Sequence, residues 1–233
     1  MREIVFDTET TGLSFPGGDR LVEIGCVELV NRVETGRTFH AYFHPERAMP
    51  PEAAAVHGLT DAFLSDKPLF AARVDEVLAF LDDAPLVAHN AIFDMSFLNG
   101  ELDRCGRPAV AMARMVDTLP IARSKHPGAK HSLDALCSRY GVDRSHRVLH
   151  GALLDAQLLA QVYVELMGGR QIGLGLVAEA KRDAAAPAAA SRPRVARPPR
   201  HFAATPGELA AHRAFISTLS DPLWETGELA EQA

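Results

Sequence analysis

Residues 4–12 read Ile-Val-Phe-Asp-Thr-Glu-Thr-Thr-Gly, or IVFDTETTG, and this stretch decides the fold. Its three bulky apolar residues predict a buried strand, and two acidic residues follow at once. Successive strand side chains point to opposite faces, so Asp7 and Glu9 share one face while Thr8 lies on the other. Two like charges this close favour a cation between them. The alternative is a surface turn closed by Gly12, because acidic residues are common in turns.

The composition is that of an ordinary globular chain, with 233 residues of which 47 % are hydrophobic and 23 % charged. We find neither a signal-peptide pattern nor an uninterrupted apolar run of about 18 residues, so we expect a cytoplasmic protein that does not bind a membrane. Cys26, Cys105 and Cys137 lie far apart and form no CxxC pair. They predict reduced thiols rather than disulfides or a thiolate zinc site.

The charge is unevenly distributed along the chain. The net charge is −6, but residues 181–200 hold six basic residues against one Asp, a local charge of +5 that leaves −11 for the rest. This balance argues against a protein that holds nucleic acid on a broad basic surface. An acidic body that binds an anion needs metal ions, or a partner that does the holding.

Two kinds of hydrophobic pattern alternate within residues 1–169. Apolar, β-branched runs predict five strands, at about 4–6, 20–30, 39–43, 86–88 and 115–119. Helical spacing predicts four helices, at about 69–83, 93–105, 132–140 and 152–167. The short polar connection at 31–37 predicts antiparallel pairing of the second and third strands. Together they predict one α/β domain, a mixed five-stranded sheet flanked by helices.

The composition changes after residue 169. Residues 170–200, rich in Pro, Ala and Arg towards their end, cannot build a core and predict a flexible linker. Order returns in a tail at 201–233, where Thr205 to Glu208 form a capping-box pattern that opens a short helix. The apolar residues of this tail need a surface on this domain or on a partner, and they are Leu209, Phe215, Ile216, Leu219 and Trp224.

Two further segments bear on the acidic pair. AHNAIFD supplies Asp94 where a predicted strand gives way to a helix, and HGALLD supplies His150 and Asp155 where the last helix begins. Each is weak alone, because an acid in a first helical turn often complements the helix dipole and a lone His is often a satisfied loop residue.

Taken together, these residues follow the order D-x-E, then D, then H-x4-D. This pattern resembles the DnaQ-like, or DEDD, family of 3′–5′ exonucleases, which implies a ribonuclease H-like fold. Gly151 stands where the tyrosine subclass carries Tyr, and His150 places the chain with the histidine subclass (DEDDh). All five positions are intact, which implies an active enzyme.

The resemblance implies two divalent ions, Mg²⁺ or Mn²⁺, and carboxylate oxygens suit such hard ions. Asp7, Glu9 and Asp155 would ligate the metal directly and so meet the substrate, with Asp7 as the bridge. Asp94 would hold the second ion through water. His150 is suited to take a proton from the attacking water, because histidine is the side chain that commonly acts as a base near neutral pH, and its place ahead of the helix suggests that it moves as substrate arrives.

Further polar residues lie outside this set. In PEAAAVHGLT, the resemblance implies that Glu52 and His57 hold the terminal nucleotide, while a surface helix start followed by a turn is the alternative. Asp117 also matches a family position, and we interpret it as structural. His126 and His131 have no acid or cysteine at a spacing that completes a ligand set.

Two longer segments narrow the resemblance. HSLDALCSRYGVD and LHGALLDAQLLAQVY are similar to segments of the epsilon subunits of bacterial DNA polymerase III. The likeness implies a proofreading subunit that removes mispaired nucleotides from the 3′ end of a DNA primer. Its partners would be the polymerase alpha subunit and the sliding clamp, and whether a small third core subunit binds stays open.

The end of the chain carries the partner motifs. Gln171, Leu174 and Leu176 resemble the peptides that dock on the bacterial clamp, although a simple flexible exit from the domain would look similar. The tail resembles the segment that binds the polymerase subunit, with Trp224 as an anchor.

Two rival functions remain at this stage. A stand-alone ribonuclease that trims RNA 3′ ends would use the same catalytic domain but would not need the tail. A tether that bridges polymerase and clamp would need the tail but not five intact catalytic positions.

Overall fold

The computed structural model describes residues 1–147, 149–169 and 204–220. It falls into two compact units, Met1–Gly175 and Leu176–Ala233. The predicted clamp motif at 171–176 and Trp224 lie outside the described residues, as does the whole predicted linker at 170–200.

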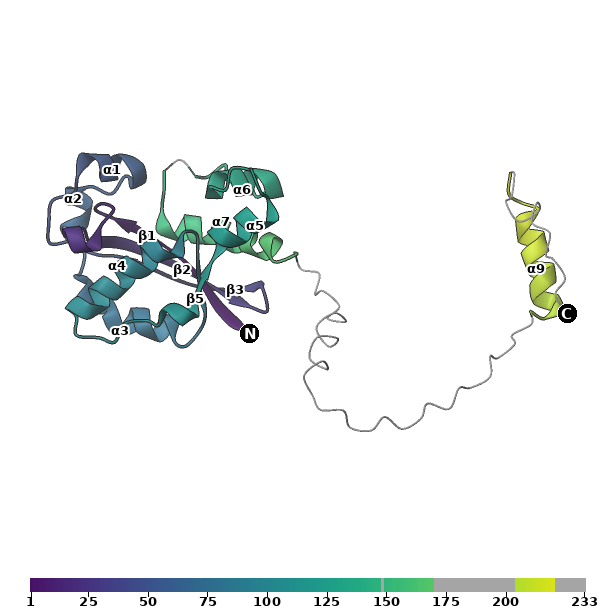
Figure 1. Ribbon diagram of the computed structural model, residues 1–233, viewed down its shortest axis with the longest axis horizontal. Coiled ribbons are helices and arrows are strands. Elements are labelled where there is room, and N and C mark those ends of the chain that lie inside the picture. Colours follow the sequence, from purple (N-terminus) through teal and green to yellow (C-terminus); the bar gives the residue numbers. More distant parts are fainter. Residues whose placement is uncertain (148, 170–203, 221–233) are drawn as a thin grey trace, which may run out of the picture. The chain divides into compact units, whose positions relative to one another are not determined.

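The first unit is built on one five-stranded sheet (Figure 1). Its strands run in the order β3-β2-β1-β4-β5. The first three pair antiparallel, whereas β4 pairs parallel with both β1 and β5. The strands are β1 (Arg2–Thr10), β2 (Leu21–Val30), β3 (Val33–Tyr42), β4 (Leu86–Ala88) and β5 (Met115–Asp117). The prediction of a mixed five-stranded sheet is confirmed.

Helices flank this sheet. They are α1 (Pro51–His57), α2 (Asp61–Leu64), α3 (Phe70–Leu81), α4 (Ala91–Arg104), α5 (Thr118–Lys125), α6 (Leu133–Tyr140) and α7 (Ala152–Leu166). Two short 3-10 turns, η1 (Phe15–Gly17) and η2 (Met112–Arg114), complete the unit. Each of the four helices predicted from hydrophobic spacing is present, within about three residues of its expected bounds.

The structure corrects several predicted bounds. Strand β1 continues to Thr10, so the two acids lie inside the strand rather than beyond it, because backbone pairing with β2 continues past the apolar run. The connection at 31–37 is mostly strand, since Asn31 and Arg32, with φ of 51° and 65°, make the turn alone. Helices α2 and α5 were not predicted, because short polar helices lack a long apolar period. Helix α1 lies where a surface helix start followed by a turn was the alternative for PEAAAVHGLT, and Gly58 ends it.

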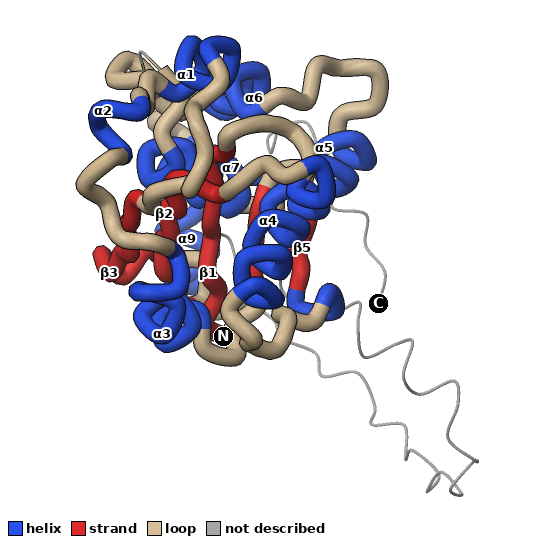
Figure 2. Tube along the Cα trace, turned by 90° about the vertical axis from the view of Figure 1, so that its left-hand side faces the viewer, coloured by secondary structure: helices blue, strands red, loops and turns tan. Residues whose placement is uncertain are grey.

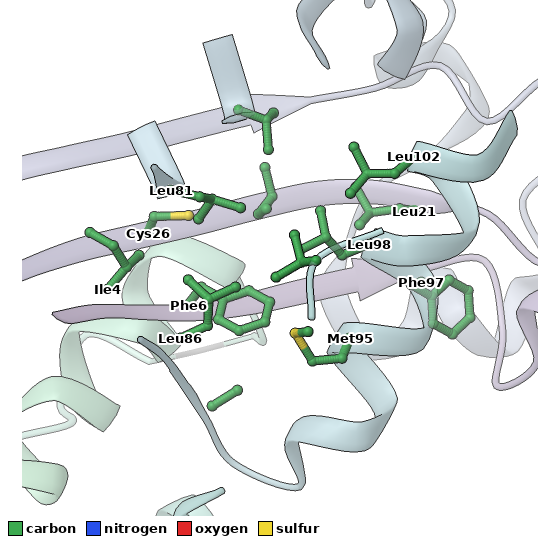
Figure 3. Packing of buried hydrophobic residues seen from close by; sticks show 14 of the residues in the cluster. Ile4, Phe6, Leu21, Cys26, Leu81, Leu86, Met95, Phe97, Leu98 and Leu102 are labelled. Atoms are coloured by element: carbon green, nitrogen blue, oxygen red, sulfur yellow. The ribbon is translucent and has the colours of Figure 1, made fainter. Parts of the chain in front are cut away.

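Alternation along β1 divides the core into two layers. Ile4 and Phe6 pack with residues of α3 and α4, and Figure 3 shows Phe6 beside Met95 of α4. Val5 points the other way and packs with residues of α7, including Leu159. The sheet is therefore buried on both faces, and each face has its own helices.

Helices α1 and α6 lie at the end of the sheet towards which β1 runs (Figure 2). Parallel strands β1, β4 and β5 all finish at that end, where α4 and α5 begin. Such ends of parallel strands commonly hold the functional residues of α/β proteins.

The second unit contains α9 (Pro206–Ile216). The predicted capping box is confirmed: Thr205 accepts from the backbone of Glu208, and the Glu208 carboxylate accepts from the backbone of Thr205. Phe215 is 63 % exposed, which leaves an apolar surface for contact.

Other sequence expectations have structural outcomes as well. None of the helices within the described ranges has the length and apolarity to cross a membrane. All three cysteines are free; Cys26 and Cys137 are buried and Cys105 is half-buried.

Candidate active site

The alternation of β1 places the first two acids. Because Val5 faces α7, Asp7 and Glu9 continue on that face, as the sequence predicts. Thr8 points to the opposite face, where its hydroxyl donates to Asp94 Oδ1 at 2.7 Å.

The fourth acid, Asp155, arrives through a close approach of α7 to the sheet. Gly25 is the β2 partner of Asp7, and a Cβ atom there would lie 2.2 Å from the backbone nitrogen of Leu153. Only glycine allows α7 to begin this close to the strand. Asp155, in the first turn of α7, is thereby set beside the β1 acids.

A cavity of about 560 Å³ joins these residues. All predicted catalytic, metal and substrate residues line it: Asp7, Glu9, Glu52, His57, Asp94, His150 and Asp155. Residues 148 positions apart in the sequence thus come together around one volume, and none of the seven lies elsewhere.

His150 lies at the rim of this cavity, with 49 % of its side chain exposed. Its Nδ1 is 3.6 Å from Asp155 Oδ2. Ligand atoms of Glu9, His150 and Asp155 all lie within 4.8 Å of one another, a spacing that one metal ion can bridge.

Electrostatics at the site favour a bound cation. Burial, followed by the charges of Asp94 and Glu9, raises the pKa of Asp7 well above its usual range. Burial and nearby carboxylates raise the pKa of Glu9 to about 8. Burial also raises the pKa of Asp94 to about 7, although the hydrogen bond from Thr8 opposes this. Such buried carboxylates favour either protons or divalent ions.

Glu52 and His57 come from α1. Glu52, in its first turn, is exposed to the cavity. His57 is buried; its Nδ1 accepts from the Leu59 backbone at 3.1 Å, while its Nε2 has no hydrogen-bond partner in the described part of the chain. A buried polar atom at the cavity wall without a partner is available to a ligand.

Sequence reasoning missed Arg147. Its guanidinium bonds both oxygens of Asp155, from Nε at 2.5 Å and from Nη2 at 2.7 Å. Nη1 contacts Asp134 at 3.2 Å and Nη2 lies 3.0 Å from His150 Nδ1. The bond to Asp155 raises the pKa of Arg147. Its position three residues before His150 was the available signal.

A second missed residue is Glu23, which is 3 % exposed and lies directly opposite Glu9 in the β1–β2 pairing. His40 Nε2 lies 2.7 Å from its Oε1. Glu23 adds a fifth carboxylate beside Glu9 on the same face of the sheet, and an acidic residue on a strand that pairs with β1 was the signal for it.

The residues interpreted as structural do have structural contacts. Asp117 accepts from the backbone of Asn90 at 3.0 Å and caps α5 through Leu119 at 2.9 Å. His126 contacts the Tyr140 hydroxyl at 2.7 Å. His131 donates from Nε2 to the carbonyl of His126.

Comparison with known proteins identifies relatives that are exonucleases or polymerase subunits. Residues 4–163 match the sequence model of a family described as Exonuclease. The chain is 55 % identical to DNA polymerase III subunit epsilon of Rickettsia conorii over 180 residues, which cover 76 % of this chain and 78 % of that protein. It is 48 % identical to the subunit of the same name from Escherichia coli over 176 residues, 72 % of each chain.

Solved structures share the fold. Exonuclease X, solved in complex with 5′ overhanging duplex DNA, matches with a TM-score of 0.55 and 28 % identity, over 70 % of this chain and 90 % of that one. A 3′-exonuclease that recognises the histone mRNA stem-loop matches with a TM-score of 0.61 over 74 % of this chain and 64 % of that one. Its identity of 17 % carries a likeness of fold alone.

Proposed function

Because this chain belongs to the exonuclease family of the DNA polymerase III epsilon subunits and is a 3′–5′ proofreading exonuclease, we propose that it removes the 3′-terminal nucleotide of a DNA primer with two Mg²⁺ or Mn²⁺ ions. The ions would be held by Asp7, Glu9, Asp94 and Asp155. One observation carries this proposal: these four carboxylates and His150 border a single cavity, although they come from three separate segments of the chain.

The donor set fits divalent metal ions. Asp7, Glu9 and Asp94 are carboxylates whose pKa values are raised, so a cation would relieve their mutual repulsion. Oxygen ligands suit Mg²⁺ and Mn²⁺, and the cluster within 4.8 Å consists of Glu9, His150 and Asp155, which supply carboxylate oxygens and one imidazole. When bound, two such ions activate water and stabilise the attacking and leaving oxygens of an in-line displacement at phosphorus.

The protein's own side chains bind and orient the substrate. His150, half-exposed at the rim, would accept the proton of the attacking water. Glu52 and the unpaired Nε2 of His57 would hold the terminal nucleotide. A mispaired terminus costs less to unpair than a matched one, which gives selectivity without reading the base.

The proposed partners follow from the same family. The polymerase and clamp would hold the DNA, which explains how an acidic chain of net charge −6 acts on it. We assign polymerase binding to the tail at 201–233, where α9 exposes Phe215. The clamp motif at 171–176 and a third core subunit rest on the sequence alone. A role in replication places the protein in the cytoplasm.

The decisive experiment measures release of nucleotides from a 3′-mismatched DNA primer, beside a matched primer and an RNA of the same sequence. We expect Mg²⁺-dependent preference for the mismatched DNA, and none of it in an Asp7→Ala variant. Equal or faster trimming of the RNA would favour the stand-alone ribonuclease. Inactivity on all three would favour the tether.

A further inference from the structure

Arg147 occupies Asp155 in a side-on fork. Nε donates to one oxygen of the carboxylate and Nη2 donates to the other. The side chain of Arg147 is 9 % exposed and that of Asp155 is 4 % exposed. Bidentate arginine–carboxylate pairs of this kind are among the strongest charge-assisted hydrogen bonds. Arg147 is therefore a built part of the site rather than a surface residue that swings past it.

The fork competes directly with a metal ligand role for Asp155. A carboxylate has about four lone-pair positions, and a bidentate guanidinium takes one on each oxygen. A cation that approaches Asp155 from the same side would have to displace the guanidinium. The same guanidinium lies 3.0 Å from His150 Nδ1, the nitrogen that faces Asp155. One side chain thus engages both a proposed metal ligand and the proposed base.

Alternative contacts exist for the guanidinium once it leaves Asp155. Asp134 Oδ1 lies 3.2 Å from Nη1, and its side chain is 46 % exposed. Removal of the guanidinium with no other cation in its place would destabilise the folded protein, because it leaves a buried carboxylate unpaired. A divalent ion that takes the place of the guanidinium restores the charge balance, so the exchange is feasible only when the ion arrives.

We propose that Arg147 is an internal counter-ion that competes with a divalent metal ion for Asp155, and that metal binding transfers the guanidinium off Asp155 and frees His150. This inference rests on the proposed metal site. The guanidinium would stabilise the acidic cluster before metal binds. Metal binding at Asp155 would then also release His150, the proposed base.

The test is metal affinity rather than activity. Full-length protein, stripped of metal with a chelator, would be titrated with Mn²⁺ by calorimetry or by the loss of free Mn²⁺ signal in electron paramagnetic resonance. Arg147→Gln keeps a hydrogen-bond donor without the competing charge, so we expect it to bind Mn²⁺ more tightly than wild type. The expected factor is about 10 to 100, the size by which partners of metal ligands usually change metal affinity. Arg147→Lys keeps the charge without the fork and should fall between the two.

Arg144→Gln is the matched control. Arg144 lies in the same loop and contacts the same oxygen of Asp134, at 3.0 Å, and Asp134 is the only acid to which the structure pairs it within the described residues. Its Mn²⁺ affinity should equal that of wild type. Urea denaturation adds a second readout: Arg147→Gln should be less stable than wild type without metal, and the gap should close when Mn²⁺ is saturating.

The failures are distinguishable. If wild type binds Mn²⁺ and Arg147→Gln binds it equally or more weakly, the competition is wrong, and Arg147 instead orders Asp155 for the metal. If neither protein binds Mn²⁺, the metal site itself is wrong and the inference falls with it. If Arg147→Gln is unfolded without metal, folding that occurs when Mn²⁺ is added but not in metal-free buffer still supports the competition. Failure to fold at any Mn²⁺ concentration overturns it.

Discussion

Two buried arginines of this protein make nearly the same contacts and serve different ends. Arg20 bonds Glu101 side-on, from Nε at 2.7 Å and Nη2 at 2.8 Å, and reaches Glu46 with Nη1 at 2.8 Å. Arg147 bonds Asp155 with the same two atoms and reaches Asp134 with Nη1. The arginine side chains are 10 % and 9 % exposed.

The surroundings separate the two pairs. Arg20 and Glu101 are enclosed by backbone, with the Pro45 carbonyl accepting from Arg20 and the Leu21 amide donating to Glu101. The pair therefore joins the start of β2 to α4 as a fixed connection, since Arg20 immediately precedes the strand. Arg147 and Asp155 instead border a cavity that also holds Glu9. Equal geometry thus gives a permanent connection where backbone surrounds it and an exchangeable one where other carboxylates compete for the cation.

Removing the acid from each pair should separate activity from stability most sharply. Asp155→Asn should lower kcat/KM by about 10³-fold, because a carboxylate ligand that acts on transition-state charge is lost. Glu101→Gln should leave the activity of the folded protein near that of wild type. Steady-state kinetics well below the melting temperature would measure both. Comparable losses in the two variants would mean that the pairs are not functionally distinct.

Removal of Arg20 should have the next largest effect, on the free energy of unfolding. Arg20→Met leaves Glu101 buried without its cation, and breaking such a pair costs about 3–5 kcal/mol of unfolding free energy. This loss should persist at saturating Mn²⁺, because the ion binds elsewhere. Urea denaturation with and without Mn²⁺ gives the measurement, and rescue by the metal would contradict the assignment of this pair as structural.

The sequence predicted the parts of this molecule whose signal is local. Alternation in IVFDTETTG placed Asp7 and Glu9 on one face, and the start of a helix placed Asp94 and Asp155, as the structure has them. The family resemblance then joined these segments. The resemblance placed these segments in one site without any knowledge of the loops between them.

The residues that were missed act across the fold. Gly25 matters because α7 approaches it, and Glu23 because it lies opposite Glu9 on the neighbouring strand. Arg147 matters because its side chain reaches Asp155 in the first turn of α7. A glycine inside a strand does signal close approach, but neither register nor loop path can be read from one segment, so these three positions stayed unassigned.

The pH dependence of stability should distinguish the two regions more gently. Burial raises the pKa of Glu9 from its ordinary value of 4.5 to about 8, so the folded protein binds the proton more tightly than the unfolded chain does. Stability without metal should therefore fall as the pH rises through this window, by roughly 2 kcal/mol between pH 6 and pH 8 from Glu9 alone. The raised pKa of Asp7 acts in the same direction.

Thermal or urea denaturation of the chelator-treated protein across this range would measure the slope. Glu9→Gln should flatten it, whereas Glu52→Gln, an exposed acid in the same cavity, should not. Saturating Mg²⁺ should also flatten it and raise the melting temperature, because the ion replaces the proton and binds only the folded state. A wild-type slope that Glu9→Gln leaves unchanged would mean that other groups carry the titration.

The smallest effect tests where the exchangeable pair ends. Arg144 and Arg147 share the same oxygen of Asp134, but Arg144 is 47 % exposed, and pairs of this kind contribute about 0–1 kcal/mol. Arg144→Gln should therefore change the unfolding free energy by less than about 0.5 kcal/mol, with or without Mn²⁺. Asp134 would then do no more than accept a hydrogen bond from the Arg147 guanidinium after it leaves Asp155. If Arg144→Gln instead altered stability only when metal was present, Asp134 would belong to the exchange, because removing its second arginine would change how strongly it draws Arg147 away.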